Sequence, residues 1–295
     1  MNKPGYDFAV FGGDLRQWYV AETLARKGYS VITYAIPILS KEKKSDSALS
    51  LKEAISRADR LVGPIPLTKD KQTIYSKNVE DDLELSSFCK LLRYGQILAA
   101  GCLSDAICTK CRDKGVSCFD FMKDDSIAIL NSIATAEGAI AEALLRRPEN
   151  LHGSRCLVLG FGKCGRTLAR KLQALSVTTT VCARGEAARA VAYTEGFDTI
   201  DFTDLTSVME QYSYIFNTVP ALVCSKDELQ SMNKDALLID IASAPGGVDY
   251  RAAKELGKSA YLCLGLPGKY SPKSSADALI NALLLYSQKQ LNSSI

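Results

Sequence analysis

Histidine is almost missing from this chain of 295 residues, in which His152 is the only one. Zinc sites usually combine a cysteine pair with histidines or with a second pair. Oxidation of an alcohol needs a group poised near neutral pH to take the hydroxyl proton. His152 precedes the first predicted strand of the second half, at the end opposite to ligand-binding edges. We therefore expect neither a zinc site nor histidine-assisted oxidation of an alcohol.

Strong net charge and long apolar runs are lacking as well. The formal net charge is +3, from 36 basic and 33 acidic residues, which predicts no binding to nucleic acid. No run approaches the roughly 18 apolar residues of a membrane span, and the first residues show no secretory h-region. We expect a cytoplasmic protein that does not bind membranes.

Cysteine, by contrast, is frequent, with ten residues in the chain. Four of them lie close together in the first half, at Cys102, Cys108, Cys111 and Cys118. They contain one Cys-x-x-Cys spacing but no second pair. Others fall in predicted buried strands, where free cysteine behaves as a small apolar residue. We predict reduced thiols and no metal, and the role of the four stays open.

The length fits two domains of about 150 residues each. In both halves short apolar runs alternate with amphipathic stretches, which predicts βαβ units and parallel sheets. The strands expected in the first half are 8–11, 30–34, 61–62, 96–100 and 116–119. Those expected in the second half are 156–159, 179–182, 214–216, 236–241 and 260–264. Residues 40–50 are polar and are predicted to form a mobile surface loop.

The predicted fold class is α/β, with two doubly wound domains joined by a long helix. Residues 1–125 form a flavodoxin- or Rossmann-like substrate domain, and 126–150 form the linking helix, which Pro148 ends. Residues 151–273 form a second, Rossmann-type domain. Residues 274–295 form a final helix whose position suits packing back across the domain junction.

The central motif is a glycine-rich turn between the apolar strand 156–159 and the helix 163–174. It reads Gly160, Phe161, Gly162, Lys163, Cys164 and Gly165. Alone such a motif is weak, but here a strand precedes it and a helix follows it. Gly160 makes the tight turn, Gly162 admits the pyrophosphate, and Gly165 lets helix and strand pack closely. The helix start then holds a diphosphate.

The end of the next strand distinguishes the two nicotinamide cofactors. NAD proteins usually place an acidic residue there to bond the ribose hydroxyls, whereas this chain has Ala183 and Arg184. A guanidinium binds a 2′-phosphate through charge-assisted hydrogen bonds. NADP is therefore the predicted cofactor and NAD the less favoured one, although Arg184 as a solvated residue is the alternative interpretation. Arg189 is a second candidate for the same phosphate.

Further candidates follow two later strands, because ligands bind at the carboxyl ends of parallel strands. They are Asn217, Thr218 and Val219 after one strand, and Ile241 and Ser243 after the next. The first three are expected to flank the nicotinamide ribose. A second glycine turn, Gly12-Gly13-Asp14, lacks the third glycine of a phosphate loop and is interpreted as a plain turn.

Several motifs together resemble the family of dipicolinate synthase A subunits of spore-forming bacteria. They are Phe8–Gln17, Asn131–Ile140, the glycine motif, Phe216–Val223, Ile239–Gly247 and Gly265–Lys273. The glycine motif is generic to Rossmann proteins, but the set is specific. The resemblance implies a dehydrogenase that oxidises dihydrodipicolinate to pyridine-2,6-dicarboxylate with NADP, together with a flavoprotein-like B subunit, in the mother cell during sporulation.

Aromatisation of the substrate agrees with the lack of histidine, because it supplies its own driving force and needs only a weak base or water. The catalytic base and the oligomeric state stay open, a homo-oligomer included. Candidate donors for a small dicarboxylate substrate are Arg16, Gln17, Asn131, Ser132, Thr135 and Ser243. The loop 265–273 is a candidate cover for the nicotinamide. For each, packing or surface exposure is the alternative.

Two other functions stay open. One is a non-catalytic NADP-binding subunit that regulates or supports a flavoprotein partner, which the missing acid/base pair also permits. The other is a different NADP-dependent dehydrogenase of the same architecture, such as a relative of alanine or methylenetetrahydrofolate dehydrogenase.

Overall fold

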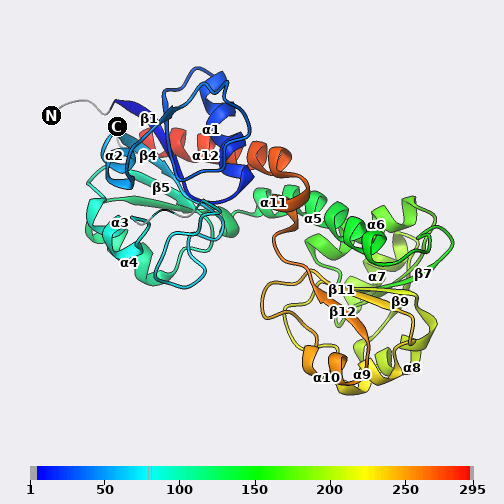
Figure 1. Cartoon of the computed structure of the whole chain (residues 1–295). Coiled ribbons are helices and arrows are strands. Elements are labelled where there is room, and N and C mark those ends of the chain that lie inside the picture. The colour runs from blue at the N-terminus through cyan, green and yellow to red at the C-terminus, as the bar shows by residue number, and fades with distance from the viewer. Residues whose placement is uncertain (1–4, 79, 81, 293–295) are drawn as a thin grey trace. The chain divides into compact units, whose positions relative to one another are not determined.

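A computed structural model describes residues 5–78, 80 and 82–292 (Figure 1). The chain folds into two units. Unit 1 comprises residues 1–130 and 272–295, and unit 2 comprises residues 131–271. Each unit has a sheet of parallel strands with helices around it, so the predicted fold class is confirmed.

Unit 1 has six parallel strands in the order β3-β2-β1-β4-β5-β6. They are β1 (Tyr6–Phe11), β2 (Val31–Tyr34), β3 (Asp46–Ser47), β4 (Ala58–Val62), β5 (Ile97–Ala100) and β6 (Ser117–Asp120). The helices are α1 (Leu15–Arg26), α2 (Leu51–Ser56), α3 (Leu85–Leu91), α4 (Asp105–Asp113) and α12 (Pro272–Asn292), with a 3-10 turn, η1 (Phe121–Lys123).

Strand β1 is covered on both faces, which explains why it is a continuous apolar run rather than an alternating one. Ala9 and Phe11 pack into a core with α2, α3 and α4. Phe8 and Val10 point to the other face and pack with α1 and α12. The carboxyl-terminal helix therefore completes the core of unit 1, where it lies beside α1 (Figure 1).

Unit 2 repeats the arrangement with six parallel strands in the order β12-β11-β10-β7-β8-β9. They are β7 (Arg155–Leu159), β8 (Thr178–Cys182), β9 (Asp198–Ile200), β10 (Tyr214–Asn217), β11 (Leu237–Asp240) and β12 (Ser259–Leu262). The helices are α6 (Lys163–Ala174), α7 (Glu186–Thr194), α8 (Leu205–Val208), α9 (Lys226–Ser231), α10 (Tyr250–Glu255) and α11 (Leu266–Tyr270), with 3-10 turns η2 (Phe202–Asp204) and η3 (Met209–Gln211).

Numbered from its own first strand, each sheet has the order 3-2-1-4-5-6 of the dinucleotide-binding fold. The order reverses between the first and fourth strands of each unit. In unit 2 that point lies between β7 and β10, which are neighbours in the sheet. The carboxyl ends of these two strands are therefore where the fold places a ligand.

The predicted long helix is α5 (Asp125–Arg146), whose residues are shared between the two units. Among the described residues it is the one helix long and apolar enough to cross a membrane, with a mean hydropathy of 1.3, a feature that was not expected from the sequence. A core helix passes the same test. Ala136, Ala139 and Ala143 are fully buried in the core of unit 2, which accounts for much of this apolar character.

Two predicted loops have more structure than expected. Within residues 40–50, the buried carboxylate of Glu22 accepts hydrogen bonds from the backbone N–H groups of Lys44 and Ser45 and from the Ser45 hydroxyl, so the loop is attached to α1 rather than free. Residues 265–273, predicted as a Gly/Pro loop, contain α11 and the start of α12. The short elements β3, β9, α2 and α10 were not predicted either.

Candidate nucleotide site

The glycine motif lies where the fold places a ligand, between β7 and α6. The backbone N–H of Gly160 donates to the carbonyl of Cys182 at the end of β8, over 2.8 Å. Gly160 has a φ of +94°, a left-handed conformation that favours glycine. The turn is thus tied to the neighbouring strand.

Glycine is required at the three positions of the motif for different physical reasons. A Cβ on Gly165 would lie 2.1 Å from the Gly160 carbonyl oxygen, and one on Gly160 would lie 2.5 Å from the Thr218 hydroxyl. Packing therefore requires both. Gly162 has a φ of −79°, and a Cβ there would meet no protein atom within 4 Å. Neither backbone strain nor packing explains this glycine, whereas close approach of a ligand to the backbone does.

The start of α6 suits an anion. Gly162 is the N-cap and offers no side chain to the first N–H groups, and the first turn contains no acidic residue. Gly162 and Lys163 are exposed, Cys164 is half-buried and Gly165 is buried. Among the described residues, the positive end of this 12-residue helix therefore has no side-chain cap and no carboxylate in its own first turn. These residues fit the diphosphate of a dinucleotide.

Helix α5 packs against this start of α6. The hydroxyls of Ser132 and Thr167 share a hydrogen bond of 2.8 Å. The Thr135 hydroxyl donates to the Asn131 carbonyl and also interacts with the Cys164 thiol. Burial raises the pKa of that thiol. Ser132 is thus a packing residue rather than an exposed donor, while the buried Oδ1 of Asn131 has no hydrogen-bond partner among the described residues.

At the end of β8, Ala183 is buried and Arg184 is exposed. Within the described part of the chain, the Arg184 guanidinium makes no hydrogen bond or ion pair. Arg189 instead donates to the carbonyls of Ala183, over 2.7 Å, and Arg184, over 3.0 Å, and forms an ion pair with Asp201. Arg189 therefore fixes the loop that presents Arg184 and neutralises the carboxylate of Asp201.

A buried polar network holds the ends of β10 and β11. Asp240 is fully buried and accepts hydrogen bonds from the Asn217 side chain (2.9 Å), the backbone of Ala242 (2.9 Å) and Gly247 (2.7 Å), and the Tyr250 hydroxyl (2.7 Å). Burial and the bond to Asp240 raise the pKa of Tyr250. Four donors match the acceptor capacity of a carboxylate. The network thus fixes two loops that flank the crevice.

This network changes the role expected of Asn217, which the sequence predicted to flank the ribose. Asn217 is fully buried, and its amide also bonds both backbone groups of Val219. The Thr218 hydroxyl donates to the Leu159 carbonyl over 2.8 Å. Both side chains support the loop from inside. Asp240 itself was missed, although an acidic residue ending an apolar strand is a readable signal.

The remaining candidates of this half are more open. Val219 and Ile241 are half-buried, and Ser243 is exposed. Val219 lies close to the turn, since its Cγ2 would be 2.8 Å from a Cβ on Gly160. His152 lies in an exposed turn before β7, as expected, at the opposite end of that strand.

Helix α11 is fastened to α5 through Glu142, which was not singled out from the sequence. This carboxylate, only 2% exposed, accepts hydrogen bonds from Lys269 (2.5 Å) and Tyr270 (2.8 Å) and pairs with Arg146. Burial opposes its ionisation, but these three donors outweigh burial and lower the pKa of Glu142. A segment so attached is not the free loop that was expected over the nicotinamide.

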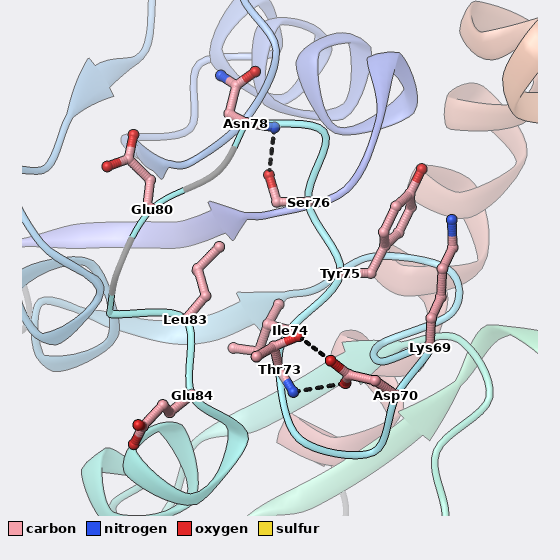
Figure 2. A pocket seen from close by; sticks show the side chains of 10 residues that line it. All are labelled: Lys69, Asp70, Thr73, Ile74, Tyr75, Ser76, Asn78, Glu80, Leu83 and Glu84. Carbon is pink, nitrogen blue, oxygen red and sulfur yellow. Dashed lines mark hydrogen bonds between the residues drawn. The ribbon is translucent and has the colours of Figure 1, made fainter.

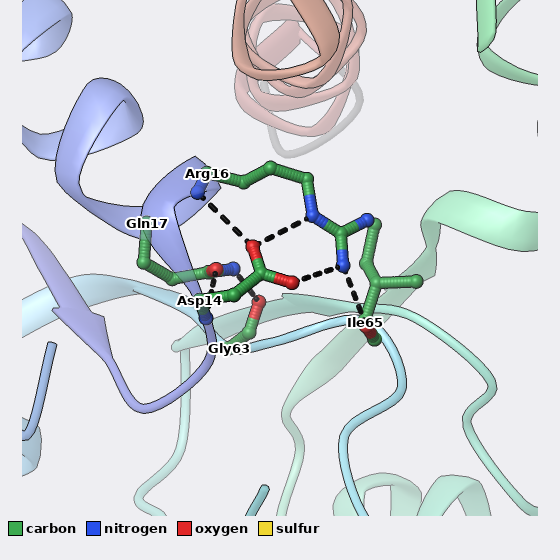
Figure 3. A network of polar contacts seen from close by, with 5 residues as sticks. All are labelled: Asp14, Arg16, Gln17, Gly63 and Ile65. Carbon is green, nitrogen blue, oxygen red and sulfur yellow. Dashed lines mark hydrogen bonds and ion pairs between the residues drawn. The ribbon is translucent and has the colours of Figure 1, made fainter. Parts of the chain in front are cut away.

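In unit 1 the candidates Arg16 and Gln17 lie just after β1, but their side chains serve the fold (Figure 3). Arg16, 6% exposed, binds both carboxylate oxygens of Asp14 over 2.9 and 2.8 Å and the carbonyl of Ile65 over 2.8 Å. Gln17 is fully buried and bonds the carbonyl of Gly63 and the N–H of Asp14. Neither offers its full donor set to a substrate.

Unit 1 also contains a hollow of about 300 Å³ (Figure 2). Its walls carry the carboxylates of Asp70, Glu80 and Glu84 but a single cation, Lys69, which lies 3.6 Å from the centre of the Tyr75 ring. An excess of negative charge disfavours a dicarboxylate. The hollow therefore adds no candidate for binding the substrate carboxylates.

Comparison with known proteins agrees with both units. Residues 7–122 match the model of the N-terminal domain of the dipicolinate synthase A subunit, and residues 131–252 match the NAD-binding domain of D-isomer specific 2-hydroxyacid dehydrogenases. The A subunit of dipicolinate synthase from Bacillus subtilis (strain 168) is 29% identical over 285 residues, 95% of each chain.

Two solved structures are similar over nearly the whole chain. The dipicolinate synthase A subunit from Bacillus halodurans has a TM-score of 0.85 and 26% identity, covering 96% of this chain and 98% of that one. The corresponding chain of dipicolinate synthase from Bacillus subtilis has a TM-score of 0.84 and 26% identity, covering 98% of each chain. The predicted resemblance is confirmed, and unit 2 is an NAD(P)-binding domain of dehydrogenase type.

Proposed function

We propose that this chain, which is similar to dipicolinate synthase A subunits, oxidises dihydrodipicolinate to dipicolinate, pyridine-2,6-dicarboxylate, with NADP as the hydride acceptor. The observation that carries the cofactor is the start of α6, where Gly162 leaves the backbone bare and no acidic residue stands in the first turn. The likeness to such an enzyme over 95% of the chain supports the substrate.

The preference for NADP rests on Arg184. Its exposed guanidinium follows β8, where an acidic residue would favour NAD. The carboxylate of Asp201, which lies beside this loop, is neutralised by its ion pair with Arg189. A 2′-phosphate would therefore meet an available cation at this position, with the exposed carboxylate of Glu186 two residues further along the chain.

NADP bound at the start of α6 would supply the hydride acceptor for the oxidation of the substrate ring. The chain's part is to bind and orient: α6 holds the diphosphate, and the Asp240 network holds the loops at the ends of β10 and β11. His152 lies at the end of β7 opposite to the glycine motif, so it is not placed to accept the substrate proton. That proton would pass to water or to a weak base, which is sufficient because formation of the aromatic product drives the reaction.

The proposals for a partner subunit and for the location in the cell rest on the same similarity to dipicolinate synthase A subunits. The relatives are named as the A component of dipicolinate synthase, and we propose that a flavoprotein-like B component assists the reaction in the cytoplasm of the mother cell. A second candidate function is a non-catalytic NADP-binding subunit, which the distance of the one histidine from the ligand-binding edge also favours. Cofactor binding is common to both functions, and only turnover distinguishes them.

One assay tests the reaction. The purified chain, with and without its B component, is mixed with freshly prepared dihydrodipicolinate and NADP. Absorbance of reduced cofactor and of the pyridine dicarboxylate is followed together. We expect both products in equal amounts. Cofactor binding without turnover under either condition would instead identify the non-catalytic function.

The cofactor preference is tested with Arg184→Glu. We expect NADP binding to weaken relative to NAD binding by about 1.5 to 3 kcal/mol, the scale of a hydrogen bond to a charged group. Titration of protein fluorescence with each cofactor measures this ratio. Arg251→Glu makes the same change in net charge at an 89% exposed side chain on α10 and should leave the ratio unchanged. Equal losses for both cofactors in Arg184→Glu would refute the assignment.

A further inference from the structure

A group of thiols in unit 1 has no part in the proposed dehydrogenase. Cys108 and Cys111 lie three residues apart on α4, so they share one face of that helix. Cys118 lies on β6, in register with the buried Leu98 of β5. All three sulfur-bearing side chains pack in the same apolar core. A helix and the strand that follows it therefore bring these cysteines together.

The thiols interact with one another directly. The Cys118 thiol lies within electrostatic range of the thiols of both Cys111 and Cys108, and its larger interaction is with Cys111. The S–H of Cys118 lowers the pKa of Cys111, because it stabilises the thiolate there. Cys111 is fully buried, whereas Cys118 is half-buried and reachable from solvent. The interaction with Cys111 and burial raise the pKa of Cys118. The stabilised thiolate and the access from solvent therefore belong to different members of a closely packed pair.

Metal binding is a poor use for this group. No set of three His, Cys, Asp or Glu side chains among the described residues has the arrangement of a metal site. The carboxylate of Asp120, which influences Cys118 electrostatically, is already bound to the N–H groups of Cys102, Leu103 and Met122. Two neighbouring thiols without a metal have one characteristic reaction, oxidation to a disulfide.

We propose that Cys111 and Cys118 form a reversible intrachain disulfide when the chain meets a peroxide. One thiolate attacks a peroxide oxygen, which breaks the O–O bond, gives a sulfenic acid and releases hydroxide. The second thiolate attacks that sulfur, forms the S–S bond and releases another hydroxide. The two thiol protons convert the hydroxides to water, so two thiols and one hydrogen peroxide give one disulfide and two waters.

The sequence allows this bond to be mapped without any variant. A protease that cuts after lysine separates the cysteines of interest into the fragments 91–110, 111–114 and 115–123. Cys111 lies alone in the second and Cys118 alone in the third, while Cys102 and Cys108 are in the first. After treatment with hydrogen peroxide and blocking of free thiols, mass spectrometry should find 111–114 joined to 115–123.

We expect two of the ten thiols to be lost and dithiothreitol to restore both. Cys111→Ser and Cys118→Ser should each abolish the joined fragment, and Cys102→Ser, at an exposed and separate thiol, should retain it. Fluorescence of Trp18, which is buried in unit 1, checks that each variant is folded. Attachment of 115–123 to 91–110, oxidation confined to Cys102, or no loss of thiols would each overturn the proposal.

Discussion

The first strand-to-helix turns of the two units differ, although the sheets around them have the same strand order. In unit 2 the turn ends at Gly162, which has no side chain to cap α6. In unit 1 the turn ends at Asp14, whose carboxylate accepts from the N–H of Arg16 and from its guanidinium. The positive helix end that unit 2 leaves for a ligand is satisfied in unit 1 by the chain itself.

In unit 1 a second loop also covers the turn between β1 and α1. The loop after β4 crosses it, where the N–H of Gly13 donates to the Tyr75 carbonyl (2.7 Å) and the N–H of Lys77 donates to the Gly13 carbonyl (2.8 Å). A Cβ on Gly12 would lie 2.7 Å from the same Tyr75 oxygen. Strand order alone therefore does not make a nucleotide site, because the cap residue and the next loop decide whether the helix start is open.

The largest expected effect is a difference in stability between a variant of Arg16, after β1, and a variant of Arg184, after β8. Arg16→Ala leaves the buried carboxylate of Asp14 without its cation, which should cost unit 1 about 3 to 5 kcal/mol of unfolding free energy. Arg184→Ala removes an exposed, unpaired guanidinium and should change stability by less than about 0.5 kcal/mol.

Urea denaturation measures both variants. Trp18, the only tryptophan, is 5% exposed in the core of unit 1, so its fluorescence follows that unit. Cofactor binding follows unit 2, which contains the candidate nucleotide site. Similar losses in the two variants, or a stable Arg16→Ala, would show that the Asp14 pair is not what closes the turn of unit 1.

A smaller effect is expected when the cap of unit 1 is transferred to unit 2. Gly162→Asp places a carboxylate at the start of α6, where it should weaken NADP binding at least about 100-fold, because like charges brought together cost several kcal/mol. The protein should stay folded, since aspartate is a favourable N-cap and a Cβ there meets no protein atom within 4 Å.

Gly162→Ala is the matched control for this change. It adds the Cβ without the charge, so its loss of NADP affinity should be clearly smaller, as measured by calorimetric titration. If the two variants bind NADP equally well, charge at the cap does not distinguish the two turns.

The smallest effect concerns acid stability. Burial opposes ionisation of Asp14, but its bonds with Arg16 outweigh burial and lower its pKa below the ordinary 3.8. A lowered pKa adds stability to unit 1 above pH 3.8, and that stability is lost as the pH falls through the folded-state value. Unit 1 should therefore weaken more steeply below about pH 4 than an Asp14→Asn/Arg16→Met double variant.

Denaturation followed by Trp18 fluorescence at several pH values between 5 and 2.5 gives the two slopes. The double variant keeps the other carboxylates of unit 1, among them Glu53 and Asp124, so their contributions cancel in the difference. Parallel curves would mean that the pair adds no pH-dependent stability.

Much of the fold was predictable because buried parallel strands are short apolar runs, as in 8–11 and 156–159, and the long helix has a clear end at Pro148. The short elements were not, because β3, β9 and α10 contain too few residues to show a period. Helix α11 was missed because its Pro and Gly suggest a turn, while its attachment to the buried Glu142 comes from a residue more than 120 positions earlier.

The candidate site likewise has some features that the sequence predicted and others that it did not. The glycine spacing and Arg184 are local signals, and the structure places both at the expected edge of the sheet. The roles of Arg16, Gln17 and Asn217 were not readable, because a polar residue after a strand looks the same whether it faces a ligand or a buried partner. Each has near partners, such as Asp14 or Val219, but its distant partners Ile65, Gly63 and Asp240 are brought to it by the fold.

By itself the sequence determined that the chain has two parallel α/β halves and one bare helix start preceded by an apolar strand, since these depend on neighbouring residues. Only the tertiary structure decided that the other helix start is filled by Asp14 and Arg16, that Asp240 fixes the crevice loops, and that the final helix completes the first core. The physical reason is that polar groups must find partners once buried, and those partners are chosen by the fold rather than by position in the chain.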